Sequence, residues 1–403
     1  MNVLILAQYF PPDMGGGATR AINAAKGLLS AGCSVTCVAA FPHYPTGRIP
    51  GEYKRKLINV EYYGSLKIFR TFVPPLASEG LAKRILLFAS FSLSSLFALP
   101  FVGKVDVVWA ANPNIIAVFP SLIFRIVRGA SVVQNVDDLW PESLYDLGVP
   151  DDSSIARLGE FLARIAYQLS SVITPISPSY VQTILSKYHI DPRKVYVVPA
   201  GIDLDRFRSL RIKLPTISDG KFVVLYIGAF SPAYDFDQVF KAACLLRSSP
   251  DIQFIIQGGG ELASALKEKS QHMDSRNVTV LEKIVSRDEV ARTLIEASVL
   301  LLPLKGISST DMGISSKLYE YQAAGKPIVC CSDGQAGRYV SQTVSGIVVR
   351  PGDYEALADS ILYLRKNPDI SRRLGESGKL YVEKNMSTSR IGMRMKALME
   401  VLA

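Results

Sequence analysis

The sequence predicts an α/β protein with two Rossmann-like, doubly wound domains that face a cleft. The chain has 403 residues, which is more than one hydrophobic core usually serves. A repeating order of apolar strand, loop and amphipathic helix begins at the N-terminus and starts again at residue 222. Continuous apolar runs separated by helices are typical of parallel strands that are buried on both faces. These observations together favour two sheets covered by helices.

The first half of the chain supplies the elements of one domain in order. They are a strand over 2–10, a glycine-rich loop over 11–20, a helix over 21–32, and further strands over 33–41, 105–112 and 131–138. The second half repeats the plan. It offers strands over 222–230, 252–260, 297–304 and 327–334, with helices over 238–249 and 315–325.

A polar, irregular stretch over 201–219 separates the two halves. We therefore expect an N-terminal domain over 1–203 and a C-terminal domain over 204–386. Residues 387–403 predict a last helix that packs back on the N-terminal domain.

Composition limits the class of partner. The formal net charge of +9 favours anionic partners, which are nucleic acid, acidic lipid or phosphorylated substrates. An arginine-rich run and an interleaving of aromatic and basic residues are both lacking, so nucleic acid is not expected. The five cysteines and three histidines have no zinc-binding spacing and suggest buried thiols in a reducing compartment. The N-terminus does not resemble a signal peptide, so we expect a cytoplasmic protein or one on the inner face of the membrane.

The segment Ile85–Val102 is uncharged and follows Lys83 and Arg84. Its length reaches that of a membrane span, but its four serines and Pro100 count against one. A buried or membrane-dipping helix, with the basic pair at lipid headgroups, and a plain core helix both remain open.

Glycines mark the predicted ligand edge of both sheets. Gly15–Gly17 precede a helix, and Gly258–Gly260 end a strand. Glycine allows backbone N–H groups to approach phosphate, and a helix N-terminus favours an anion. Ordinary turn glycines are the alternative for both sets. Neither set is a G-x-G-x-x-G or P-loop motif, so NAD and ATP are not indicated.

The stretch "SSKLYEYQAAGKP" predicts a short helix that begins at two serines and ends at Gly325. Lys317 and Glu320 lie on one side of it, three residues apart. A surface salt bridge is one interpretation. The other is a donor clamp, in which a serine caps the helix, Lys317 attracts a phosphate, and Glu320 accepts hydrogen bonds from a vicinal diol.

Several stretches, in order, resemble family-4 retaining glycosyltransferases of GT-B architecture. The subgroup is the one active in O-antigen, capsule and exopolysaccharide assembly, including fucosaminyltransferase-like members. The matching stretches are "QYFPPDMGGGATR", "FPHYPTGRIPGEYKRK", "VDDLWPESLYDLG", "ITPISPSYVQTIL", "KVYVVPAGIDLDRF", "SSKLYEYQAAGKP" and "SGIVVRPGDYEALADSI".

The resemblance implies a donor site on the second domain. Glu320 would bind the donor ribose and Lys317 would lie near the pyrophosphate. The other residues assigned to donor binding are Gly16, Gly17, Gly228, Gly258 and Arg20.

Two departures from the family pattern concern this site. A second family glutamate is replaced by Met312, and the family Arg and Lys after the second domain's first strand are missing from "GAFSPAYDFD". We consider Arg20 as a compensating charge, or else as a solvated helix residue.

Acidic residues follow the last predicted strand of the first half. Asp138 is the candidate acceptor-side base, and Glu142 is a second candidate. The alternative for Asp138 is a helix cap. His43 is interpreted as a loop-packing residue. Asp203-Leu204-Asp205 spells D-x-D but matches a structural family segment, so no metal is expected.

The expected function is transfer of a sugar from a nucleotide-sugar, a UDP-sugar, with retention and without a metal or other cofactor. The expected acceptor is a polyprenyl-linked saccharide, reached through peripheral membrane contact. A UDP-sugar 2-epimerase and a degenerate, non-catalytic subunit are the alternatives.

Overall fold

The structure is a computed structural model that describes residues 1–44, 46–77, 80–111, 115–145, 148–213, 220–272, 277–306 and 313–402. It divides into two compact units, which we describe separately. The first comprises Met1–Gly201 and Thr388–Ala403, and the second comprises Ile202–Ser387. The last helix therefore belongs to the first unit, where it packs on the first helix of the chain.

Within the described residues, the first unit has a seven-stranded sheet in the order β3-β4-β2-β1-β5-β6-β7. Its strands are β1 (Asn2–Leu6), β2 (Ser34–Ala40), β3 (Ile58–Tyr63), β4 (Leu66–Thr71), β5 (Val107–Ala111), β6 (Ser131–Val136) and β7 (Val172–Pro175). Strand β3 runs antiparallel to β4, and the other neighbouring pairs are parallel. The sequence analysis assigned no strand to this antiparallel edge.

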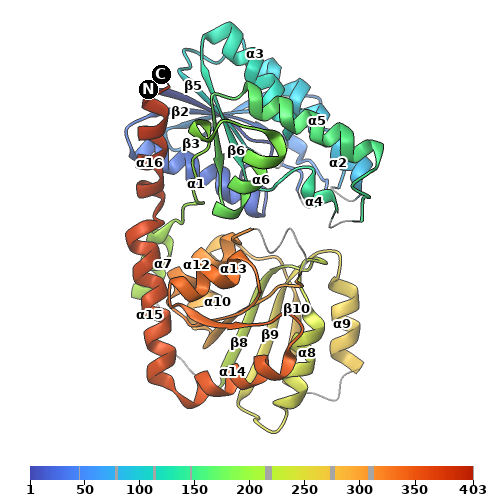
Figure 1. Ribbon diagram of the computed structural model, residues 1–403, viewed down its shortest axis with the longest axis vertical. Helices are drawn as coiled ribbons and strands as arrows, with labels where there is room; N and C mark the ends of the chain where they lie inside the picture. Colours follow the sequence, from blue (N-terminus) through green and yellow to red (C-terminus); the bar gives the residue numbers. More distant parts are fainter. Residues whose placement is uncertain are drawn as a thin grey trace. The chain divides into compact units, whose positions relative to one another are not determined.

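Helices cover both faces of the first sheet (Figure 1). The α-helices are α1 (Gly16–Ser30), α2 (Leu81–Ser94), α3 (Val118–Arg128), α4 (Glu142–Tyr145), α5 (Ser154–Leu169), α6 (Pro178–Tyr188) and α16 (Thr388–Glu400). Short 3-10 helices are η1 (Gly51–Tyr53), η2 (Ser95–Ala98), η3 (Ile115–Ala117) and η4 (Pro192–Lys194). Helices α1 and α16 pair on one face, and α2, α3 and α5 lie on the other.

The apolar segment at Ile85–Val102 forms α2, η2 and the turn that follows. Leu87, Phe88 and Phe91 point inward and are buried in the core of the first unit. By length and composition alone, Leu81–Ala98 also qualifies as a membrane span, and 39% of that window is buried. A core helix passes the same test, so this finding does not by itself indicate a span.

The second unit has a six-stranded parallel sheet, within the described part of the chain, in the order β10-β9-β8-β11-β12-β13. Its strands are β8 (Phe222–Ala229), β9 (Ile252–Gly259), β10 (Val278–Glu282), β11 (Val299–Pro303), β12 (Ile328–Cys331) and β13 (Gly346–Val349). Its helices are α7 (Leu204–Lys213), α8 (Phe236–Leu245), α9 (Ala263–His272), α10 (Arg287–Glu296), α12 (Ser316–Ala324), α13 (Gln335–Gln342), α14 (Tyr354–Lys366) and α15 (Pro368–Asn385).

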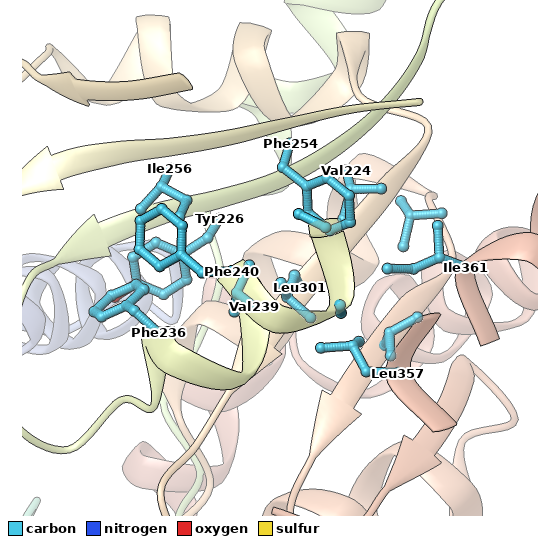
Figure 2. Close-up of a cluster of buried hydrophobic side chains, with 14 of the residues drawn as sticks. Val224, Tyr226, Phe236, Val239, Phe240, Phe254, Ile256, Leu301, Leu357 and Ile361 are labelled. Carbon is cyan, nitrogen blue, oxygen red and sulfur yellow. The ribbon is translucent and has the colours of Figure 1, made fainter. Parts of the chain in front are cut away.

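Apolar side chains from β8, β9 and β11 meet those of α8 and α14 to form the core of the second unit (Figure 2). Phe254 and Ile256 of β9 and Leu301 of β11 are buried there, as are Phe240 of α8 and Leu357 of α14. Burial of such side chains contributes about 1.5–3 kcal/mol each to folding. The core fixes the end of β8 beside α12, where the candidate donor residues lie.

Candidate functional site

Helix α12 begins at the predicted serines, but the side chain of the N-cap serine makes no hydrogen bond to the first turn. Ser315 occupies the N-cap position, and its side chain accepts no hydrogen bond from the helix. The expected serine, Ser315, is thus at the cap position, but its side chain does not form the capping hydrogen bond. The first N–H groups of a helix have no partner within the helix, and they favour an anion. Gly325 ends the helix in the left-handed conformation, with φ of 69°.

Lys317 is held by aromatic residues from β8 and the loop that follows it. Its Nζ donates a hydrogen bond to the Tyr234 hydroxyl at 2.9 Å. The same Nζ lies 5.0 Å from the ring centre of Tyr234 and 5.9 Å from that of Tyr226. These cation–π contacts fix the direction of the ammonium group. Neither tyrosine was singled out from the sequence.

Gly228 provides the room that Lys317 occupies. A Cβ at Gly228 would lie 2.2 Å from Lys317 Cε and 2.9 Å from Nζ. Its φ of +152° is also one that side-chain-bearing residues rarely adopt. Gly258 is needed for a different reason, because a Cβ there would lie 1.7 Å from the Gly228 carbonyl oxygen. Thus Gly228 shapes the site, and Gly258 lets the ends of β8 and β9 approach each other.

Glu320 lies one turn beyond Lys317 and is partly buried. Removal of solvent raises the pKa of its carboxyl group, while Lys317, Arg287 and Arg206 act in the opposite direction. Lys317 and Glu320 form no ion pair with each other among the contacts of the described residues. The surface salt bridge is therefore not what this structure shows.

Two arginines that the sequence analysis missed complete the positive surroundings of Glu320. Arg206 comes from α7 and forms an ion pair with Asp288 at 2.8 Å. Arg287 is the first residue of α10. Helices α7, α10 and α12 pack together, which brings residues far apart in the sequence into one cluster. We call the cluster of Lys317, Glu320, Gly228, Tyr234 and Tyr226 the α12 cluster.

The glycine-rich loop of the first unit leads directly into α1. Gly15 is the N-cap residue, with φ of 106°, and α1 begins at Gly16. A Cβ at Gly16 would meet no atom within 4 Å, so packing does not require glycine there. Gly17 is the second residue of α1 and is partly buried. The start of α1 thus has room for a phosphate, and the phosphate contact of Gly16 and Gly17 stays a prediction.

Arg20 does not serve as the predicted compensating phosphate charge, nor as a solvated helix residue. Only 3% of it is exposed. Its Nη2 donates to Asn135 Oδ1 and to the Val198 carbonyl, both at 2.8 Å, and its Nη1 donates to the Pro199 carbonyl. The guanidinium group therefore ties α1 to β6 and to the segment that precedes the second unit. Its charge is used inside the first unit.

Asp137 and Asp138 follow β6 and differ in their surroundings. Asp137 Oδ1 accepts a hydrogen bond from Asn135 at 2.8 Å and lies 3.6 Å from Arg20 Nε. Burial raises the pKa of Asp137 to about 7, against the lowering effect of Arg20. Asp138 is exposed beside it. Its exposure is compatible with the predicted role toward an acceptor.

Glu142 is a poor candidate for acceptor chemistry. It is the first residue of α4 and is nearly buried. Its Oε1 accepts hydrogen bonds from the Tyr188 hydroxyl at 2.7 Å and from Lys187 Nζ at 3.0 Å. Lys187 Nζ also contacts Glu160 at 2.6 Å. This network gives Glu142 a structural task, contrary to its predicted second place as a catalytic residue.

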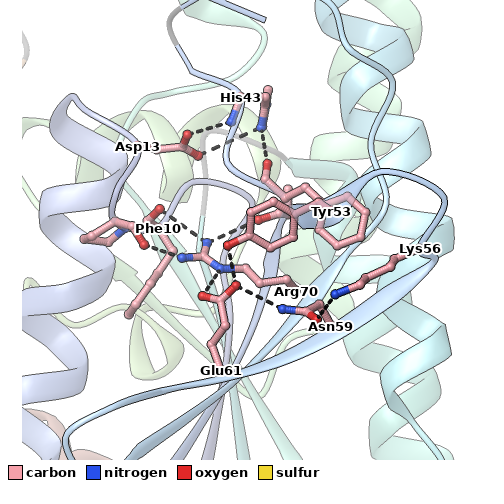
Figure 3. Close-up of polar contacts among 11 residues, drawn as sticks. Phe10, Asp13, His43, Tyr53, Lys56, Asn59, Glu61 and Arg70 are labelled. Atoms are coloured by element: carbon pink, nitrogen blue, oxygen red, sulfur yellow. Dashed lines mark hydrogen bonds and ion pairs between the residues drawn. The ribbon is translucent and has the colours of Figure 1, made fainter. Parts of the chain in front are cut away.

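His43 lies in a polar network with Asp13 and neighbouring backbone groups (Figure 3). Its Nδ1 lies 2.8 Å from the Phe41 carbonyl, and its ring stacks on that of Tyr9. Asp13 accepts hydrogen bonds from the backbone N–H groups of His43 and Tyr44. These contacts agree with a loop-packing histidine.

The D-x-D stretch lies at the start of α7. Asp205 is exposed and lies 3.6 Å from Arg208. Across the described ranges, no three His, Cys, Asp or Glu side chains are grouped as a metal site would require. Met312, where the family has a second glutamate, lies outside the described residues.

Two family models match the chain and together span most of it. "Glycosyltransferase Family 4" matches residues 14–206, and "Glycosyl transferases group 1" matches residues 210–381. With the two parallel-sheet units, these matches identify a glycosyltransferase of GT-B fold, and each half of the chain is similar to one of these two families. The predicted fold class is confirmed.

Individual relatives agree with this class. The O-antigen chain mannosyltransferase C of Escherichia coli is 23% identical over 395 residues, which are 94% of this chain and 92% of the relative. The sucrose-phosphate synthase structure from Thermosynechococcus elongatus has a TM-score of 0.75 at 17% identity and covers 100% of this chain and 98% of its own. The structure of Anabaena HepE in complex with UDP-glucose has a TM-score of 0.65 at 14% identity and covers 100% of both chains.

Proposed function

We propose that the protein transfers a sugar from a UDP-sugar to a lipid-linked saccharide during assembly of a surface polysaccharide, with retention of anomeric configuration. The α12 cluster carries the donor part of this proposal. An open helix N-terminus, a fixed ammonium group and a carboxylate one turn later suit a nucleoside diphosphate. The N–H groups and Lys317 would hold the pyrophosphate, and Glu320 would accept hydrogen bonds from the ribose hydroxyls.

The electrostatics of the cluster support this assignment. The hydrogen bond and the ring contact with Tyr234 hold the Lys317 ammonium group beside the loop that follows β8. Burial raises the pKa of Glu320, and the positive charges of Lys317, Arg287 and Arg206 oppose that rise and so favour a carboxylate that can accept hydrogen bonds. The UDP-glucose complex of HepE supports the donor class because that protein has the same fold.

The leaving group sets the chemistry. Departure of the nucleoside diphosphate places negative charge on the phosphate oxygen, which Lys317 and the α12 amides would stabilise. Because Glu320 is assigned to the ribose, we propose front-face attack, in which the departing phosphate accepts the proton of the acceptor hydroxyl. This scheme needs no metal. Asp138 would orient the acceptor from the first unit.

The acceptor side of the proposal is supported by the relative from O-antigen synthesis. The resemblance implies a polyprenyl-linked acceptor for this chain. A polyprenyl-linked acceptor would require the enzyme to work on the inner face of the membrane.

Release of nucleoside diphosphate from a panel of UDP-, GDP- and ADP-sugars, with a polyprenyl-linked saccharide as acceptor, tests this function. We expect release of UDP that requires acceptor, persists in EDTA, and yields a product with the donor's anomeric configuration by NMR. An inverted product would refute the mechanism. Release that EDTA abolishes and Mg²⁺ or Mn²⁺ restores would refute metal independence. Absence of transfer from every donor would point to the non-catalytic alternative, and an epimerised sugar nucleotide would point to the epimerase.

A further inference from the structure

Helices α2, α3 and α5 form one continuous layer on the first sheet (Figure 1). Helix α3 packs on β5 and β6 and contacts both α2 and α5. Helices at the surface of a soluble domain usually turn polar residues outward. The outer side of this layer, together with η2 and the turn after it, instead carries many exposed apolar side chains. We call it the three-helix face.

Helix α3 shows the inversion most clearly. Ile126 is 82% exposed, and Ile123 and Val127 are also exposed. The inner side of the helix is formed by Ser121 and Phe124, which are fully buried. At 100° per residue, Ile126 lies nearly opposite Phe124, so an apolar side chain occupies the centre of the outward side.

Helix α2 and its continuation repeat the pattern. Leu86 and Leu93, seven residues apart and therefore on one side of α2, are exposed, and Leu93 is 70% exposed. Phe97 in η2 and Phe101 in the next turn extend the apolar surface beyond the helix. Helix α5 adds exposed side chains of the same kind, namely Ile155, Leu158, Phe161 and Leu169.

The charged residues around these apolar side chains are mostly basic, although Asp151 and Asp152 are exposed just before α5. The basic residues of the layer are Lys83, Arg84, Lys104, Arg125, Arg128, Arg157 and Arg164. Between residues 80 and 130 the sequence has one acidic residue, Asp106, which lies 3.5 Å from Lys104. Helix α5 has one acidic residue, Glu160, whose carboxylate is paired with Lys187.

Exposed apolar side chains bordered by basic residues match the interface of an anionic bilayer. The apolar groups enter the boundary of headgroups and acyl chains, and the long basic side chains reach the phosphates. A protein partner of the usual kind would not require this excess of basic residues. Large exposed apolar side chains that gather on neighbouring helices point to an interaction site.

We propose that the three-helix face docks on an anionic lipid bilayer, with Leu86, Leu93 and Ile126 entering the headgroup boundary. This inference rests on the membrane location in the proposed function, and it names the surface of the protein that would contact the membrane. It assigns α3 and α5 to the contact, whereas the sequence indicated only the segment at Ile85–Val102. In this proposal the helices lie along the surface of the bilayer and do not span the bilayer, since their inner sides pack on the first unit.

Co-sedimentation with vesicles, without donor or acceptor, tests the proposal. The full chain is mixed with phosphatidylcholine vesicles that contain about one third phosphatidylglycerol, and with vesicles of phosphatidylcholine alone. We expect binding to the anionic vesicles that weakens as salt is raised to about 0.5 M. The variant Leu86→Ser/Leu93→Ser/Ile126→Ser should bind at least roughly tenfold more weakly. The variant Lys83→Gln/Arg157→Gln/Arg164→Gln should lose the preference for anionic vesicles.

A matched control comes from the opposite face of the same unit. Met393 on α16 is 54% exposed and Arg394 beside it is exposed, so Met393→Ser/Arg394→Gln should bind like wild type. Melting temperatures of the variants show that the first unit remains folded. We call the triple serine variant the leucine variant and the triple glutamine variant the charge variant. If the leucine variant melts at a lower temperature than wild type, vesicle binding of the charge variant alone tests the proposal.

Two results with the variants would overturn the inference. One is unchanged vesicle binding in a folded charge variant or leucine variant. The other is a concentration-dependent dimer in sedimentation velocity that the leucine variant abolishes, which would make this face a contact between copies. If the wild-type protein transfers sugar to a soluble acceptor but does not bind the anionic vesicles, only this inference is refuted. Vesicle binding without any transfer would refute only the proposed function.

Discussion

A methyl group at Gly228 tests the α12 cluster without touching a charged residue. In Gly228→Ala the new Cβ would lie 2.2 Å from Lys317 Cε, a distance that the lysine must relieve by moving. The backbone at φ of +152° adds strain of about 1–3 kcal/mol. The ammonium group then leaves the Tyr234 hydroxyl and its predicted place at the pyrophosphate. A hydrogen bond to a charged group contributes about 1.5–3 kcal/mol, so we expect UDP affinity to fall roughly 10- to 150-fold.

Calorimetric titration with UDP measures this effect, and urea denaturation measures the strain. Lys317→Ala should lose a similar amount of affinity, and the double variant should lose little more than Lys317→Ala alone because both changes remove one interaction. Gly103→Ala is the matched control, since a Cβ there meets nothing within 4 Å. Wild-type UDP affinity in a folded Gly228→Ala protein would refute the assignment.

Two further predictions concern the acidic residues of the first unit. Burial raises the pKa of Asp137 from 3.8 to about 7, so the folded state binds this proton more tightly than the unfolded state and stability falls as pH rises from about 4 to 7. The Asp137→Asn variant does not lose stability in this way. Measured with urea, its free energy of unfolding relative to that of wild type should therefore increase by about 4 kcal/mol between pH 4 and pH 8. A difference between the two proteins that does not change with pH would contradict the burial argument. Glu142→Ala should destabilise the first unit by about 2 kcal/mol, because Tyr188 loses its Glu142 acceptor and Lys187 keeps only Glu160, and should leave kcat/KM near the wild-type value. A large fall in kcat with unchanged stability would return Glu142 to the catalytic residues.

The fold was predictable because its signal is local. Parallel strands buried on both faces leave continuous apolar runs, and the repeat of the whole pattern marked a second sheet. The edge at β3 and β4 was missed because Ile58–Tyr63 has no fully buried residue and contains Asn59 and Glu61, so no apolar run marks it.

The chemistry at each site was harder to predict because it depends on residues that are distant in the sequence. Arg20 looked available from its place after the glycines, but its acceptors Val198 and Pro199 lie 178 and 179 residues away. Lys317 and its partner Tyr234 are separated by 83 residues. A tyrosine in "GAFSPAYDFD" is a weak signal alone, although its position after the first strand of the second unit, where the resemblance implies phosphate contacts, was a usable one.

The central claim is that Glu320 and the start of α12 bind the nucleoside diphosphate of the donor. Calorimetric titration of UDP into wild type and Glu320→Ala, in buffer without added metal, tests it most directly. Removal of the acceptor from a buried ribose diol costs about 1–3 kcal/mol, so the variant should bind roughly 5- to 150-fold more weakly while melting like wild type. Equal UDP affinity in the two folded proteins would contradict the account.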